Sequence, residues 1–129
     1  MRIIVADQHA KVRRALVALI VELPEFSLVG EVSNTQELIT LAEKSTADLI
    51  LLDQKLTGDS IVDVLTRLHD LEPRPYLMVM SSDPETSRMV LQAGADSFVS
   101  KSDQPEWLIR NLKNYAQKAG EFNMREDHP

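Results

Sequence analysis

Two carboxylates, a hydroxyl and an ammonium group stand at or just after apolar runs of the chain. Asp7 and Asp53 each follow four apolar residues, Ser81 follows a third run, and Lys101 comes shortly after a fourth. A pair of carboxylates can hold a divalent cation, and one of them can attack a phosphoryl group as a nucleophile. The hydroxyl and the ammonium can balance phosphoryl charge. These residue types predict a phosphoryl-transfer site, provided that the fold brings them together.

A single aspartate after an apolar run is weak evidence, because it is more often a helix cap or a turn residue. The combination carries the prediction. In an open parallel sheet, ligands bind at the carboxyl ends of the strands, where the loops open. Polar residues at several strand ends would therefore converge on one edge of the sheet.

The apolar runs themselves predict strands. They cover residues 3–6, 27–30, 49–52, 76–80 and 97–99. The first, third and fourth runs lack alternation, which is typical of strands covered on both faces. Between the runs, apolar residues recur with helical spacing. The clearest stripes are Val12, Leu16, Leu19, Ile20 and Leu23; Ile61, Val64, Leu65 and Leu68; and Leu108, Ile109, Leu112 and Ala116.

Helix boundaries are also marked. Asn34 and Glu37 match a capping box, Asp83-Pro84-Glu85 is typical of a helix start, and Gly94 of a helix end. Alternating strands and helices imply a parallel sheet with right-handed crossovers. We predict a doubly wound α/β domain of five strands and five helices.

Composition limits the class of protein. The chain has 129 residues, 43% of them hydrophobic, which suits one domain over residues 1–120 with a polar tail or linker start over 121–129. The formal net charge of −6 argues against direct binding of nucleic acid. The chain has no cysteine, and the N-terminal apolar run is too short for a signal peptide or membrane span, so we expect a cytoplasmic protein.

The chain resembles response-regulator receiver domains, which are CheY-like, over essentially its whole length. It is most similar to receivers of the NarL/LuxR-type regulators. The matching stretches are Val5-Ala6-Asp7-Gln8-His9, Leu28-Val29-Gly30-Glu31, Ala47-Asp48-Leu49-Ile50-Leu51-Leu52-Asp53, Leu91-Gln92-Ala93-Gly94-Ala95-Asp96, and Lys101 with Pro105-Glu106. The resemblance implies the flavodoxin-like (βα)5 fold with strand order 2-1-3-4-5.

The resemblance also implies roles for single residues. Asp53 would be the phosphoacceptor, and it would bind Mg²⁺ together with Asp7 and the backbone carbonyl of Lys55. Ser81 would be the switch hydroxyl, with Ser82 as the alternative. Lys101 would pair with the phosphoryl group, and Phe98 would be the switch aromatic.

Three features depart from the family. Gln8 replaces a second acid at the metal position, and since it carries no charge we expect Mg²⁺ affinity about tenfold lower or more. Thr57 replaces the proline of an Asp-x-x-x-Pro-Gly motif, which predicts a less rigid loop. The segment from Ser81 to Gly94 is short, which predicts a short loop before the fourth helix. His9 is interpreted as a residue at the start of the first helix.

The resemblance implies that a sensor histidine kinase phosphorylates Asp53 and that the surface of helix 4, strand 5 and helix 5 then changes. The chain would not be a conventional enzyme, although it would catalyse its own phosphorylation and dephosphorylation. Further partners would be a DNA-binding output domain, in a longer parent protein or separate, and a second copy in a homodimer. No membrane partner is expected.

Two other functions remain open. One is a pseudo-receiver, which is a binding module regulated without phosphorylation, and Gln8 is its main support. The other is a flavin- or nucleotide-binding protein of the same topology. That function needs a glycine-rich loop after the first strand, and residues 7–11 contain no glycine.

Overall fold

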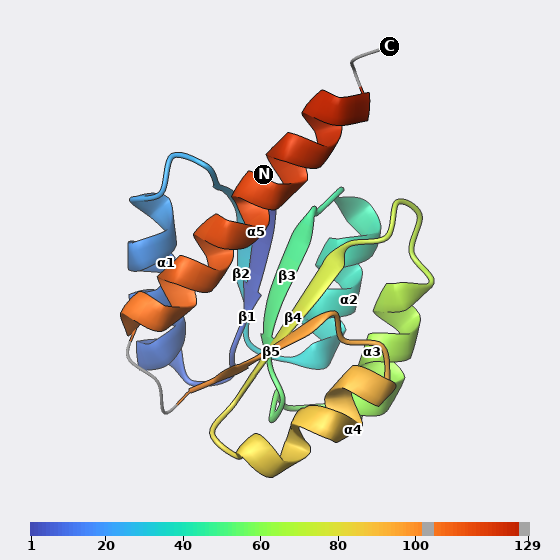
Figure 1. Cartoon of the computed structure of the whole chain (residues 1–129). Coiled ribbons are helices and arrows are strands. Elements are labelled where there is room, and N and C mark those ends of the chain that lie inside the picture. Colours follow the sequence, from blue (N-terminus) through green and yellow to red (C-terminus); the bar gives the residue numbers. More distant parts are fainter. Residues whose placement is uncertain (102–104, 127–129) are drawn as a thin grey trace.

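The computed structural model describes residues 1–101 and 105–126, in which strands and helices alternate along the chain (Figure 1). The strands are β1 Arg2–Ala6, β2 Ser27–Val32, β3 Leu49–Asp53, β4 Tyr76–Ser81 and β5 Ser97–Ser100. The helices are α1 Ala10–Val21, α2 Thr35–Lys44, α3 Ile61–His69, α4 Ser87–Gln92 and α5 Pro105–Glu126, with a short 3₁₀ helix, η1, at Pro84–Thr86.

The strands form one parallel sheet in the order β2-β1-β3-β4-β5, which confirms the predicted fold. Ala6 of β1 is in register with Leu52 of β3, and Asp53 is in register with Met80 of β4. Ser81 is in register with Ser100 of β5. The carboxyl ends of these four strands therefore lie side by side at one edge of the sheet.

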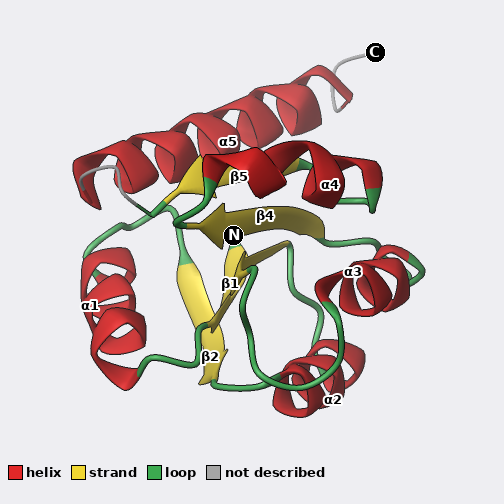
Figure 2. Ribbon diagram, turned by 90° about the horizontal axis from the view of Figure 1, so that it is seen from below, coloured by secondary structure: helices red, strands yellow, loops and turns green. Residues whose placement is uncertain are grey.

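Helices cover both faces of the sheet, with α1 and α5 on one face and α2, α3 and α4 on the other (Figure 2). Alternate residues of β1 serve the two cores: Ile3 and Val5 pack toward α1 and α5, while Ile4 and Ala6 pack toward α2 and α3. All four side chains are fully buried. Double coverage is thus the reason that the central strand sequences lack alternation.

The predicted helix boundaries are present. The side-chain oxygen of Asn34 accepts a hydrogen bond from the Glu37 N–H at 2.8 Å. The Glu37 carboxylate reaches back to the N–H of Ser33 at 3.1 Å, one residue earlier than in a standard capping box. Asp83 caps η1 and Gly94 ends α4 with a φ of +119°, which a residue with a side chain rarely adopts. Only residues 82 and 83 separate β4 from η1, so the predicted short loop is confirmed.

Two features of the helices differ from the sequence patterns. In the predicted stripe of α1, Ile20 is buried, but Val12 and Leu19 are exposed. The last helix continues past Gly120, where we predicted the domain to end, and reaches Glu126. No helix within residues 1–101 and 105–126 has the length and hydropathy needed to cross a membrane.

Candidate functional site

The predicted site residues do converge at the carboxyl edge of the sheet. Asp7 directly follows β1, Asp53 and Ser81 are the last residues of β3 and β4, and Lys101 directly follows β5. Asp7 is fully buried, and Asp53 is 3% exposed. Ionised carboxylates are costly to bury without a partner, so each needs a cation or hydrogen-bond donors nearby.

Lys101 supplies that positive charge. Its Nζ lies 2.7 Å from Oδ2 of Asp7 and 3.0 Å from Oδ2 of Asp53. Burial lowers the pKa of the Lys101 ammonium, but the hydrogen bonds and charges of Asp7 and Asp53 outweigh burial and raise this pKa above its ordinary value. Lys101 is therefore protonated at neutral pH and bridges two carboxylates that would otherwise repel each other.

The second oxygen of each carboxylate accepts a hydrogen bond from the loop that follows it. Oδ1 of Asp53 accepts a hydrogen bond from the backbone N–H of Lys55 at 3.2 Å. Oδ1 of Asp7 accepts one from the backbone N–H of His9 at 2.9 Å, and His9 Nδ1 lies 3.4 Å from the same oxygen. Each carboxylate thus divides its oxygens between Lys101 and a neighbouring loop.

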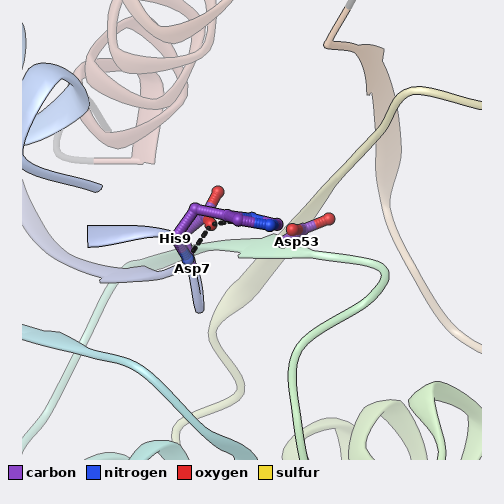
Figure 3. Close-up of side chains that lie close together, drawn as sticks. All are labelled: Asp7, His9 and Asp53. Atoms are coloured by element: carbon purple, nitrogen blue, oxygen red, sulfur yellow. Dashed lines mark hydrogen bonds and ion pairs between the residues drawn. The ribbon is translucent and has the colours of Figure 1, made fainter. Parts of the chain in front are cut away.

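His9 faces this pair of acids. It is the N-cap of α1, as predicted, and Figure 3 shows its imidazole ring pointing from the chain after β1 toward Asp53. One ligand atom each from Asp7, His9 and Asp53 lie within 4.8 Å of one another. Carboxylate and imidazole are both metal ligands, so the donor set fits a divalent cation.

Gln8 and Thr57, the two residues that depart from the family pattern in these loops, contact each other. The Thr57 hydroxyl donates a hydrogen bond to the side-chain oxygen of Gln8. The Thr57 carbonyl accepts from the N–H of Thr35 at 2.9 Å. Thr57 therefore links the loop after β3 to Gln8 after β1 and to the first residue of α2, and the amide oxygen of Gln8 is already hydrogen-bonded.

Ser81 is buried at the end of β4, whereas Ser82 is exposed. The Ser81 hydroxyl lies 2.8 Å from Oε1 of Gln54, to which it donates, and accepts from the Asp83 N–H at 3.0 Å. A backbone hydrogen bond of 2.8 Å joins the Lys101 N–H to the carbonyl of Ser81. Ser81 therefore has direct links to the residue after Asp53 and to Lys101.

Phe98 lies inside β5, where it is half-buried and packs against the core beneath α2, α3 and α4. Sequence reasoning found the residue types of the pocket but missed three contacts within it: the Gln54 partner of Ser81, the Thr57 partner of Gln8, and the His9 ring beside the acids. A histidine two residues after a candidate metal ligand was the one available signal.

Comparison with known proteins agrees with this geometry. Residues 3–113 match the response regulator receiver domain family. The nitrate/nitrite response regulator protein NarL of Escherichia coli strain K12 is 34% identical over 126 residues, which are 96% of this chain and 57% of NarL. NarP of the same strain is 26% identical over 126 residues, which are 96% of this chain and 59% of NarP. The chain thus spans less than two-thirds of these curated relatives.

Solved structures share the fold. The isolated receiver domain of RcsB from Salmonella enterica serovar Typhimurium, determined in the presence of phosphomimetic BeF3−, has a TM-score of 0.78 and 22% identity, covering 88% of this chain and 86% of that one. A LuxR-family two-component response regulator from Aurantimonas has a TM-score of 0.81 and 22% identity, and the match covers 91% of this chain and 85% of that one. As its motifs predicted, the chain belongs to the response regulator receiver domain family of two-component systems.

Proposed function

We propose that Asp53 accepts a phosphoryl group from the phosphohistidine of a sensor kinase and passes that event on as a conformational change. A carboxylate oxygen of Asp53 attacks phosphorus, the P–N bond breaks, and the kinase imidazole leaves. The observation that carries the proposal is the position of Asp53, which ends β3 in a buried pocket with the Lys101 ammonium 3.0 Å from one oxygen.

The residues of the pocket support this proposal. Asp7, Asp53 and the backbone carbonyl of Lys55 would hold Mg²⁺, with Gln8 beside them. The bound ion would balance the charge on the phosphoryl oxygens. Lys101 is already close enough to Asp53 to follow a phosphoryl group with its ammonium. Such a protein would catalyse its own phosphorylation and dephosphorylation and would not be a conventional enzyme.

The output step uses the links around Ser81. Phosphorylation places about two negative charges at the sheet edge. In the structure the Ser81 hydroxyl donates a hydrogen bond to Oε1 of Gln54. If the hydroxyl turns toward the phosphoryl group, this hydrogen bond breaks. The backbone bond between Lys101 and Ser81 couples that movement to the end of β5. We propose a population shift between two packings of α4, β5 and α5, in which Phe98 is the switch aromatic.

Acetyl phosphate tests the proposal, since it can donate a phosphoryl group without a kinase. With Mg²⁺ the intact protein should gain the mass of one phosphoryl group, and with EDTA it should not. In the same samples, amide hydrogen exchange should change in peptides from η1, α4 and β5. A protein that gains no mass at saturating Mg²⁺ would not be a phosphoacceptor.

A pseudo-receiver is the second candidate, and the hydrogen bond between Gln8 and Thr57 favours it. The amide removes a negative charge from the metal position, and its oxygen is held by another loop. In this case the chain would act as a binding module, and the absence of phosphorylation would leave its fold and its surfaces intact. The acetyl phosphate experiment separates the two candidates.

Gln8→Asp should increase the response to Mg²⁺. The new carboxylate adds charge beside Asp7, so that the cation binds more tightly, while like-charge repulsion lowers the melting temperature without metal. A series of Tm measurements over Mg²⁺ concentration should therefore start lower and rise more steeply than in the wild type. Gln36→Asp adds the same charge at an exposed position of α2 and is the control. Equal slopes for all three proteins would show that residue 8 does not act on the metal.

The partners follow from the proposed function. A sensor histidine kinase would supply the phosphoryl group. The relatives in the comparisons are longer than this chain and include transcriptional regulators, which supports a DNA-binding output domain as the recipient of the signal. Self-association through the α4, β5 and α5 surface is the alternative output.

A further inference from the structure

We propose that His9 is a ligand of the metal ion in the Asp7–Asp53 pocket and shifts its preference from Mg²⁺ toward cations that favour nitrogen, such as Zn²⁺. The inference deepens the proposed function, because it concerns the same pocket. It needs only that the pocket binds a cation, whether or not Asp53 is phosphorylated.

The spacing of the candidate ligand atoms supports this role for His9. His9 Nδ1 lies 3.4 Å from Oδ1 of Asp7. Two ligands of one cation, with bonds of about 2.0–2.2 Å and tetrahedral or octahedral angles, lie about 3–3.5 Å apart. One ligand atom from each of Asp7, His9 and Asp53 lies within 4.8 Å of the others, so a small side-chain movement would bring all three onto one ion. Lys101 need not leave, because it contacts the Oδ2 atoms and His9 is on the Oδ1 side of Asp7.

His9 takes part in the first turn of α1 only through its backbone, where its carbonyl accepts a hydrogen bond from the Arg13 N–H at 2.8 Å. It occupies the N-cap position of α1, but its side chain makes no capping hydrogen bond. The side chain is 59% exposed, so the ring can rotate onto an ion without leaving a packed core. Its Nδ1 lies beside Asp7, one of the two proposed acidic ligands.

The charge and the donor atoms of the pocket also favour a cation that prefers nitrogen. Gln8 brings no carboxylate to the pocket, and its amide oxygen accepts the Thr57 hydroxyl. Among the described side chains, the candidate metal ligands are therefore two carboxylates and one imidazole, besides the backbone carbonyl of Lys55. Mg²⁺ prefers oxygen ligands, whereas imidazole suits zinc, nickel and iron. The missing carboxylate at residue 8 weakens Mg²⁺ binding, and the imidazole of His9 strengthens Zn²⁺ binding. Both changes therefore shift the preference of the pocket from Mg²⁺ toward Zn²⁺.

The test compares Zn²⁺ and Mg²⁺ binding by calorimetry in the full chain, the His9→Asn variant and a His69→Asn control. Asparagine is a good N-cap residue, so α1 should still form, but it lacks the imidazole. His69 is exposed at the last position of α3. We expect His9→Asn to lose about tenfold or more in Zn²⁺ affinity, with less than about a twofold change for Mg²⁺, and His69→Asn to match the wild type.

Nuclear magnetic resonance of the ring nitrogens provides the direct readout. Zn²⁺ should shift the ¹⁵N signals of His9 and leave those of His69 unchanged. Asp7→Asn should weaken Zn²⁺ binding as well, which places the ion in this pocket rather than elsewhere on the surface. Unshifted His9 nitrogens, or full Zn²⁺ affinity in His9→Asn, would overturn the inference. Neither result depends on acetyl phosphate, so failure here leaves the phosphoacceptor role untouched, and failure of phosphorylation leaves the metal result standing.

Discussion

Asp53→Asn should abolish the mass gain under acetyl phosphate and Mg²⁺. An amide lacks the negative charge and the nucleophilic oxygen needed to attack phosphorus. The shape of the side chain is retained, so the variant should fold, and the Lys55 N–H can still donate to the oxygen at this position. Intact-protein mass spectrometry with and without acetyl phosphate measures the effect, and a thermal unfolding curve verifies the fold.

Asp59→Asn is the matched control, because Asp59 is an exposed acid between the same strand and α3. It loses the same charge, yet we expect it to gain one phosphoryl group as the wild type does. A mass gain that persists in Asp53→Asn, or a phosphoryl group mapped to another residue, would contradict the assignment of Asp53.

Lys101→Met should destabilise the protein by about 3 kcal/mol, at the low end of the cost of breaking a buried ion pair. Without the ammonium, the carboxylates of Asp7 and Asp53 remain buried and repel each other. Mg²⁺ should recover more stability in this variant than in the wild type, since the ion replaces the missing positive charge. Urea unfolding with and without Mg²⁺ measures both effects.

Lys55→Met removes a positive charge from an exposed side chain two residues after Asp53 and should change stability by less than about 0.5 kcal/mol. A similarly small effect for Lys101→Met would mean that its ion pairs do not hold the carboxylates together in solution.

The stability difference between the wild type and Lys101→Met should depend on pH. Because folding raises the pKa of Lys101 above its ordinary value of 10.5, its contribution is fully present below pH 10.5 and is lost as pH rises through the raised pKa. The stability difference between wild type and Lys101→Met should therefore be constant from about pH 7 to 9 and shrink above pH 10.5. A difference that falls between pH 7 and 9 would contradict the raised pKa.

Local patterns were sufficient to predict most of the fold. Runs of four or more apolar residues identified the doubly covered strands, and the side chains of Asn34 and Asp83 form the predicted caps. Caps and periodicity act over a few residues and can be inferred from sequence alone. The apolar stripe of α1 was a less reliable guide to burial, since Val12 and Leu19 are exposed. Periodicity shows that a helix has an apolar face, but it does not show how fully a neighbouring element covers that face.

The sequence by itself determined that the chain alternates strands and helices, that acids and a lysine end three strands, and that Gln8 and Thr57 depart from the family. Only the tertiary structure decided which of these residues contact one another. Gln8 is hydrogen-bonded to Thr57, which is 49 residues away, and Lys101 bridges Asp7 and Asp53, which are 94 and 48 residues away. The His9 ring beside Asp7 and Asp53 depends on the same loops. Such contacts depend on sheet order and loop paths, which bring together residues that no local pattern connects.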